Sequence, residues 1–323
     1  MNSQPLSVLF TSAGRRVELI NCFVAAARQL GVTLSTHACD LRPELSAACQ
    51  AASHAFAVPS CDAPDYVDTL LEYCARHKID LLVPTIDPEL YPLALAKERF
   101  ESIGTKVHVS GPRTIEIVRD KAKTVEVLQR HGVPVPKTGL SESVRNSPRD
   151  WEWPAFIKPS GGSASRGIDV IDSPGSIAES YDEPMIVQQL LEGDEYTINI
   201  FVDTNGALKT AIPHKRLAVR AGEVEKGITV RRSDFEDIAT KVAEALPDPE
   251  GVMCFQLIDD IRHGPRVFEI NARFGGGYPL ADRAGGRFAE RLLYKLREGP
   301  DWIDSQWKDG VTMLRYDAAV FID

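Results

Sequence analysis

The sequence predicts an α/β domain with a parallel, doubly wound sheet, followed by an antiparallel α+β region. Two patterns predict this fold class. Short apolar runs alternate with helical spacing over the first third of the chain, which is typical of a parallel sheet. From Pro154 onward, longer apolar runs follow one another through short turns, which is typical of antiparallel pairing. The 323 residues are enough for two or three packed units.

The first third of the chain alternates between strand-like and helix-like segments. Apolar runs predict strands at residues 7–11, 34–39 and 79–84, and helical spacing predicts helices at 17–30 and 66–77. Ligands of open parallel sheets bind at the carboxyl ends of the strands. We therefore expect ligand contacts at residues 12–16, at Asp40 and at residues 85–89.

The rest of the chain begins with a helical pattern at about residues 114–131, which ends at Gly132-Val133-Pro134. The polar stretch at 141–150 is expected to be a loop. Three hairpins are then predicted, pairing 155–158 with 167–171, 196–202 with 207–213, and 253–259 with 266–271.

Composition excludes several classes of protein. The 37 basic and 46 acidic residues give a net charge of −9, which argues against binding to nucleic acid or to an anionic membrane surface. No leader peptide and no membrane-spanning segment is expected. None of the six cysteines forms a CxxC pair, so reduced thiols in a cytoplasmic protein are expected rather than disulfides or zinc.

The most informative segment is the predicted strand that carries Glu269, Asn271 and Arg273. Alternate side chains of a strand share a face, so these three side chains should project together. A hairpin closed near Arg262-His263-Gly264 would place Gln256 roughly opposite Glu269. Mg²⁺ prefers oxygen ligands and keeps substrate phosphates, and an arginine suits the charge on a transferring phosphoryl group. The pattern therefore predicts a phosphoryl-transfer site.

A second segment, residues 158–167, is rich in glycine and serine. It carries Lys158, Gly162, Ser163 and Ser165, and its small residues would let backbone N–H groups approach phosphate oxygens. A P-loop or dinucleotide loop opens into a helix, whereas strands flank this loop on both sides. We therefore expect a hairpin flap over a nucleotide, with Lys158 beneath it.

A third segment, residues 187–197, combines apolar side chains with amides. It would hold the edge and face of an adenine, with Glu195 accepting hydrogen bonds from ribose hydroxyls. By itself this segment is also compatible with a hinge before a strand.

These segments, in this order, resemble the ATP-grasp superfamily over about residues 113–323. The Lys-Pro-Ser loop is similar to that of D-alanine–D-alanine ligase, and the Gln256 and Glu-x-Asn-x-Arg arrangement is similar to that of carbamoyl phosphate synthetase. The resemblance implies a Rossmann-like domain at 1–112, an ATP-grasp subdomain A at 113–185, and a subdomain B with the Mg·ATP site at 186–323. Expected cofactors are ATP and Mg²⁺, for which Mn²⁺ can substitute.

The resemblance also implies roles for individual residues. Lys121 and Lys158 would contact the nucleotide, Gln188, Gln189 and Leu191 the adenine, Glu195 the ribose, and Gln256, Glu269 and Asn271 the metal ion. Arg273 would stabilise the acyl-phosphate step, and Lys215, with Arg216 as the alternative, would close over the phosphates or the acceptor. The expected acceptor pocket is formed by Arg15, Arg16, Asp87, Glu89 and residues 275–278.

The activity implied is that of an ATP-dependent carboxylate–amine ligase with an acyl-phosphate intermediate. Its partners would be small-molecule acid and amine substrates, with a second copy of the chain in a homodimer. Two alternatives stay open: a carbamoyl-phosphate-synthase-like kinase of a small acid, and a non-catalytic ATP-binding regulatory protein. Acid-dependent release of ADP and phosphate would separate a ligase or kinase from a regulatory protein.

Overall fold

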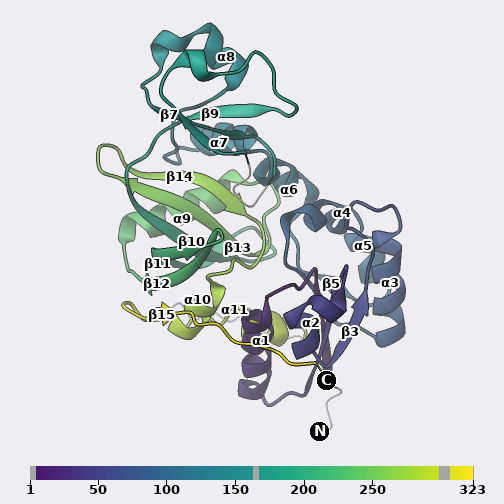
Figure 1. The fold of residues 1–323 in the computed structure, drawn as a ribbon. Helices are drawn as coiled ribbons and strands as arrows, with labels where there is room; N and C mark the ends of the chain where they lie inside the picture. Colours follow the sequence, from purple (N-terminus) through teal and green to yellow (C-terminus); the bar gives the residue numbers. More distant parts are fainter. Residues whose placement is uncertain (1–4, 163–166, 298–305, 323) are drawn as a thin grey trace.

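The computed structural model describes residues 5–162, 167–297 and 306–322. Its strands form a five-stranded, a four-stranded and a six-stranded sheet. Figure 1 shows the five-stranded sheet and its helices on one side, the six-stranded sheet beside them, and the small four-stranded sheet above it. The predicted combination of an α/β domain and an α+β region is confirmed.

The N-terminal domain is built on the parallel five-stranded sheet, in the order β3-β2-β1-β4-β5. Its strands are β1 (Leu6–Thr11), β2 (Leu34–Asp40), β3 (His54–Ala57), β4 (Leu81–Pro84) and β5 (Lys106–Val107). Its helices are α1 (Val17–Gln29), α2 (Ala47–Ala51), α3 (Tyr66–His77), α4 (Leu90–Leu95) and α5 (Lys97–Ser102), with 3₁₀ turns η1 (Pro43–Leu45) and η2 (Asp87–Glu89). The strand order reverses beside β1, so the carboxyl ends of β1 and β4 flank the crevice where ligands of such sheets bind.

The helix expected at 114–131 is two helices, which corrects that prediction. They are α6 (Pro112–Arg119) and α7 (Lys121–Arg130), separated by Asp120 in an extended conformation. The Asp120 carboxylate accepts hydrogen bonds from the backbone N–H groups of Ala122 and Lys123 at 3.0 and 3.2 Å. The break exists because this carboxylate caps the new helix, as aspartate does at helix N-termini.

The four-stranded antiparallel sheet has the order β6-β9-β7-β8. Its strands are β6 (Thr138–Leu140), β7 (Ala155–Pro159), β8 (Asp169–Ile171) and β9 (Met185–Gln189), with 3₁₀ turns η3 (Pro148–Asp150) and η4 (Pro174–Ser176). The loop expected at 141–150 is wrong, because α8 (Ser141–Asn146) and η3 lie there. Val144 on α8 is buried in the core of this subdomain, so tertiary packing rather than a periodic pattern supports the helix.

The six-stranded antiparallel sheet has the order β14-β13-β10-β11-β12-β15. Its strands are β10 (Gly193–Val202), β11 (Leu208–Arg220), β12 (Glu223–Thr229), β13 (Gly251–Asp260), β14 (Gly264–Asn271) and β15 (Thr312–Leu314). Helix α9 (Ser233–Ala245) covers one face, where Phe235 contacts Tyr196. Helices α10 (Tyr278–Ala284) and α11 (Phe288–Lys295) cover the lower half of the other face, where Phe288 contacts Phe201. The predicted hairpin partners β7–β8, β10–β11 and β13–β14 are confirmed.

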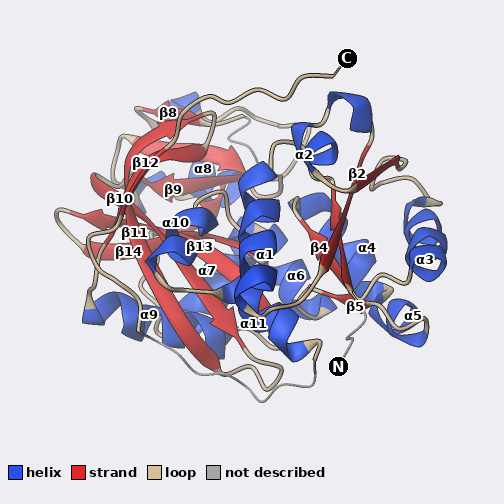
Figure 2. Cartoon of the chain, turned by 90° about the horizontal axis from the view of Figure 1, so that it is seen from below, coloured by secondary structure: helices blue, strands red, loops and turns tan. Residues whose placement is uncertain are grey.

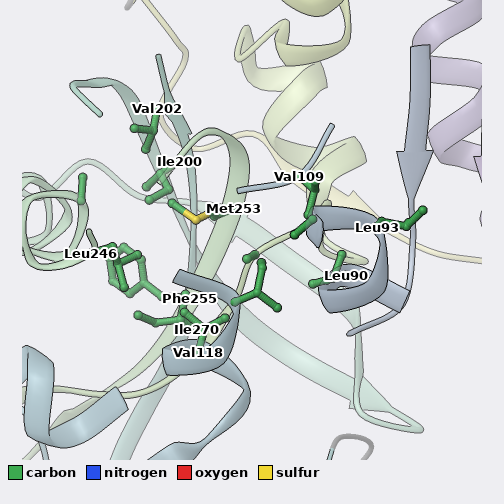
Figure 3. Close-up of a cluster of buried hydrophobic side chains, with 14 of the residues drawn as sticks. Leu90, Leu93, Val109, Val118, Ile200, Val202, Leu246, Met253, Phe255 and Ile270 are labelled. Carbon is green, nitrogen blue, oxygen red and sulfur yellow. The ribbon is translucent and has the colours of Figure 1, made fainter. Parts of the chain in front are cut away.

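The hydrophobic cores join the N-terminal domain to the six-stranded sheet. One buried cluster runs from Leu90 and Leu93 on α4 through Val118 to Phe255 and Ile270 on the sheet (Figure 3). A second cluster joins α1 to α10 and α11, which lie between the two sheets in Figure 2. The crevice of the N-terminal domain is thereby held against the six-stranded sheet. No described helix has both the length and the apolar content that a membrane span requires.

Candidate active site

A cross-strand pair at the centre of the site joins Gln256 on β13 to Glu269 on β14. The two residues are direct partners in the ladder, whereas the position of the turn predicts only that they lie roughly opposite each other. Thr197 on β10 is the next partner along this row, and His214 on β11 follows it. Directly opposed residues share a face, so all four side chains point away from α9. Within the described part of the chain, the side-chain oxygens of Gln256 and Glu269 make no hydrogen bond or ion pair.

A β-bulge produces this register. The pairing shifts by one residue between Gln256 and Leu257, which leaves Phe268 as the extra residue of β14. Bulges re-aim side chains next to active sites. Here the ring of Phe268 lies 5.4 Å from the ammonium of Lys158, which reaches over from β7 in the other sheet.

Lys158 is the cation between the two sheets. Its side chain is 5% exposed, and its ammonium also lies 5.6 Å from the ring of Phe156. Burial lowers the pKa of Lys158 to about 8, although the nearby Glu269 carboxylate opposes this shift. A desolvated ammonium near the Glu269 carboxylate is suited to an anionic ligand that brings its own counter-ion.

Asn271 is the last residue of β14, so Arg273 lies just beyond the strand and not on it as predicted, and it turns toward the N-terminal domain. Its guanidinium donates to the Asn271 Oδ1 at 2.9 Å and forms two bonds of 2.7 and 3.1 Å with Asp87 Oδ2, beside the carboxyl end of β4. Burial would lower the pKa of Arg273, but Asp87, Cys254 and Glu223 together raise it. The arginine is therefore a fixed cation at the junction of the two domains.

The glycine-rich loop is tied to the start of α7. The Lys121 ammonium donates to the carbonyl oxygens of Gly161 and Gly162 at 3.3 and 2.9 Å, and the Lys121 N–H donates to the Ser160 carbonyl at 2.8 Å. The Ser160 hydroxyl donates to Asp120 at 2.6 Å. The loop joins β7 to β8, as the predicted flap requires, and Gly162 has a positive φ of 81°. Ser163 and Ser165, also predicted to contact phosphate, lie outside the described residues.

The residues predicted to hold adenine lie where the two sheets are connected. Gln188 shares the face of Phe156 and Lys158, is 4% exposed, and donates to the Thr138 hydroxyl at 2.9 Å. Gln189 forms hydrogen bonds with the Lys137 backbone and with the His263 side chain. Leu191 is half-buried in the link between β9 and β10.

Lys215 and Arg216 are neighbours in the segment His214-Lys215-Arg216, so their side chains point to opposite faces of β11. Lys215 pairs with Tyr196, on the face covered by α9, and its ammonium binds Asp194 at 2.6 Å. Arg216 is on the other face, where it forms an ion pair with Glu195, the predicted ribose ligand. The structure therefore brings Arg216, the alternative, to the site and does not bring Lys215 there.

The expected acceptor pocket is only partly assembled. Arg16, Asp87 and residues 275–277 lie together, whereas Arg15 is exposed. Glu89 is fully buried and accepts hydrogen bonds from Ser12, Tyr66, Thr85 and Ile86, so its role is structural. Tyr278 is also fully buried.

Two residues that the sequence analysis missed complete this pocket. Glu223, at the start of β12, lies 3.1 Å from the Arg16 guanidinium, and Arg315 donates to the carbonyl of Gly276. Neither stands in a motif, and both come from segments far from Arg16 in the sequence. Alternation along β10 could have indicated Thr197 and Asn199, which share the face of Glu195.

A magnesium ion fits the donor set by its chemistry. Among the described residues, no group of three or more His, Cys, Asp or Glu side chains could hold a metal ion. Glu269 with the amide oxygens of Gln256 and Asn271 would leave coordination positions for phosphate oxygens and water, which is how Mg²⁺ is commonly bound with nucleotides.

This fold is shared with a protein solved in complex with ADP. The biotin carboxylase domain dimer of 2-oxoglutarate carboxylase from Hydrogenobacter thermophilus, solved with MgADP, ADP and bicarbonate, superimposes with a TM-score of 0.73. Its identity to this chain is 16%, and the match covers 94% of this chain and 72% of that one. At this level of identity, the match shows the fold.

Sequence comparison identifies the family. Residues 118–277 match the model of the ATP-grasp domain, and residues 8–108 match that of the PylC-like N-terminal domain. The chain contains an ATP-grasp domain, as its motifs predict.

Two curated relatives fit this assignment. The carbamoyl phosphate synthase large chain of Mycobacterium sp. (strain JLS) is 25% identical over 217 residues, which are 60% of this chain and 19% of that protein. The D-alanine–D-alanine ligase of Oleidesulfovibrio alaskensis is 29% identical over 119 residues, which are 34% of this chain and 38% of that protein. The chain thus spans about a fifth of the large chain and under two fifths of the ligase.

Proposed function

We propose that this protein is an Mg·ATP-dependent carboxylate–amine ligase that works through an acyl phosphate and releases ADP and phosphate. The observation that carries the proposal is the Gln256–Glu269 pair, whose Glu269 carboxylate acts on the buried ammonium of Lys158. Arg273 lies just beyond the end of β14, fixed by Asp87. If these groups had only a structural role, burying a lysine beside a carboxylate and an amide without hydrogen-bond partners would destabilise the fold with no compensating benefit.

Phosphoryl transfer requires that the negative charge of ATP and of the acid be neutralised together. Lys121 and Lys158 would bind the phosphates, and Glu269, Gln256 and Asn271 would hold Mg²⁺, which neutralises phosphate charge and polarises the γ-phosphoryl group. The acid's carboxylate oxygen then attacks the γ-phosphorus, and the bond from that phosphorus to the β–γ bridging oxygen breaks to release ADP. Arg273 would stabilise the charge on the transferring group.

The second step forms the product. An amine nitrogen attacks the acyl carbon, and the bond from that carbon to the phosphate oxygen breaks. The leaving group is now phosphate, whereas a free carboxylate would have to expel oxide. His214 is not suited to be the base, because burial lowers its pKa to about 3 and it is fully buried. The amine would therefore enter unprotonated or lose its proton to the departing phosphate.

The nucleotide would lie between the two sheets. Gln188, Gln189 and Leu191 would line the adenine at the link between β9 and β10, and Glu195 would accept from the ribose once Arg216 engages phosphate. We propose Arg216 for the role expected of Lys215. The pairing of Arg216 with Glu195 on the site face supports this choice.

Acid-dependent ADP release tests the proposal. Wild-type protein is screened with Mg·ATP, an amine source and a panel of amino acids, dipeptides, and small hydroxy and sugar acids. Glu269→Ala and Lys158→Ala are expected to abolish the release, whereas Lys123→Ala, an exposed residue on α7, serves as control. Release that needs an acid but no amine would indicate an acid kinase. Absence of release with every acid, despite ATP binding, would indicate a regulatory protein.

We also propose a homodimer in the cytoplasm. The Hydrogenobacter domain was solved as a dimer, which supports the first part. The six cysteines are all unpaired thiols, which supports the second. Light scattering coupled to size exclusion measures the oligomeric state, and replacing Mg²⁺ by Mn²⁺ in the release assay tests the choice of metal.

A further inference from the structure

The Glu223 carboxylate lies directly on the backbone of Gly276. A Cβ atom at Gly276 would fall 1.4 Å from Glu223 Oε2, so only glycine permits this approach. Arg315 donates to the carbonyl of the same glycine. Arg16 Nη2 lies 3.1 Å from the other oxygen of the carboxylate. The Glu223 carboxylate therefore lies in a position defined by three separate parts of the chain, which contain Gly276, Arg315 and Arg16.

The contact between Arg16 and Glu223 joins two domains. Glu223 follows a two-residue turn, Ala221 and Gly222, whose φ angles of 50° and 78° are typical of a tight hairpin. Arg16 precedes α1, at the carboxyl end of β1. The ion pair thus ties the tip of the β11–β12 hairpin to the N-terminal domain, across the crevice predicted to receive the acceptor.

The charges around this ion pair do not balance. Of the charged side chains that act on the Arg16 guanidinium, Glu223 attracts it, whereas Arg273 and Arg315 repel it. The pKa of Arg16 is lowered, first by burial and then by repulsion from Arg273 and Arg315, and Glu223 only partly offsets this. The Arg16 guanidinium therefore favours an anionic partner at this end of the crevice.

Arg16 is more accessible to an entering anion than Arg273 is. Arg273 and Asp87 are engaged with each other at 13% and 18% side-chain exposure, whereas Arg16 and Glu223 are 20% and 33% exposed. Within residues 5–162, 167–297 and 306–322, Glu223 is the one side-chain partner of the Arg16 guanidinium. A carboxylate from solvent could replace that of Glu223 without disturbing Arg273.

We propose that Arg16 determines specificity by binding a carboxylate of the acid substrate, and that Glu223 occupies this position in the substrate-free enzyme. The inference rests on the ligase function proposed above. Binding exchanges one carboxylate for another at Arg16, so the guanidinium stays paired while Glu223 is released. The exchange also frees the hairpin tip from the N-terminal domain, which makes hairpin mobility a readout of acid binding.

Whether Glu223→Gln lowers or raises the KM for the acid tests this exchange. KM values are measured by ADP release with L-alanine, L-glutamate, glycolate and gluconate as probes. Removing the competing charge is expected to lower the KM for the acid by about fivefold, the upper range for a partly exposed ion pair. Arg16→Gln is expected to raise this KM at least about tenfold, the loss typical of a charged hydrogen bond. Glu225→Gln, on the same strand, and Arg28→Gln, exposed on α1, are the matched controls.

An increase in the KM for the acid in Glu223→Gln would overturn the proposal, because Glu223 would then hold the substrate itself. If no probe or panel acid promotes ADP release by the wild type, the ligase function fails. The ion pair is still tested by deuterium exchange without substrate. Arg16→Gln should increase uptake at residues 220–229 relative to the wild type and Arg28→Gln, and equal uptake would refute the proposed contact. Unchanged circular dichroism confirms that each variant is folded.

Discussion

Replacing Lys158 by methionine is expected to stabilise the fold while removing nucleotide binding. Methionine keeps the unbranched stem between Phe156 and Phe268 but removes the buried charge. Burial lowers the pKa of Lys158 from the ordinary 10.5 to about 8. At 1.36 kcal/mol per pKa unit, the ammonium costs the folded state about 3 kcal/mol, with the attraction of Glu269 already included. We therefore expect the variant to gain about 1 to 3 kcal/mol in free energy of unfolding at pH 7.

The pH dependence gives this prediction a second signature. The folded pKa lies below the unfolded value, so below pH 8 the lysine is charged in both states and its burial cost is complete. As the pH rises from about 8 to 10.5, the folded protein loses a proton that the unfolded chain keeps, and the cost disappears. The stability difference between variant and wild type should therefore be largest below pH 8 and should close near pH 10.5.

Thermal melting without nucleotide measures the effect. A gain of this size corresponds to a rise of about 2 to 6 °C in melting temperature. Lys121→Met is the matched control, because Lys121 is only half-buried and bonded to two carbonyls, so its loss should not stabilise. Mg·ATP should raise the melting temperature of the wild type and leave that of Lys158→Met unchanged. A lower melting temperature for Lys158→Met at pH 7 would refute the conclusion that burial of the Lys158 charge destabilises the fold.

Three further predictions follow from single contacts. The Kd for Mg·ATP, measured by calorimetry, should be constant below pH 8 and rise about tenfold per pH unit above it as free Lys158 loses its charge, whereas Lys158→Arg should flatten this profile. Asp120→Ala should destabilise the fold by about 1 to 2 kcal/mol in urea unfolding, because α7 loses its cap, and an unchanged midpoint would contradict this. Gly277→Ala would place a Cβ 2.5 Å from the ring of His214, so soluble yield and melting temperature should fall, whereas Gly175→Ala has room and should retain both.

The pairing at the centre of the site could be predicted from the sequence only approximately. The turn beyond Asp260 sets the register of the hairpin, but an unbroken ladder from the Asp260–Gly264 pair would place Gln256 opposite Phe268. The bulge at Phe268 moves Glu269 into that position and turns the phenyl ring toward Lys158. A bulge depends on packing against the other sheet, and no local pattern in β14 indicates it.

Other features of the site depend on contacts between distant segments. The choice between Lys215 and Arg216 depends on the register of β11 against β10, because neighbouring residues on a strand face opposite ways. The Arg273–Asp87 and Arg16–Glu223 pairs link domains, and no periodicity carries that information. By contrast, α3 matches its predicted range of 66–77, because buried Tyr66, Leu70 and Cys74 recur at helical spacing.

The most direct test of the acyl-phosphate step follows ¹⁸O from the carboxylate of an acid identified in the ADP-release screen. In that step a carboxylate oxygen becomes the oxygen bridging carbon and phosphorus, and it leaves with phosphate. The account predicts one ¹⁸O atom in the released phosphate for each amide bond formed, and no labelled phosphate from Glu269→Ala. Phosphate released without ¹⁸O, or label transfer that persists in Glu269→Ala, would contradict it.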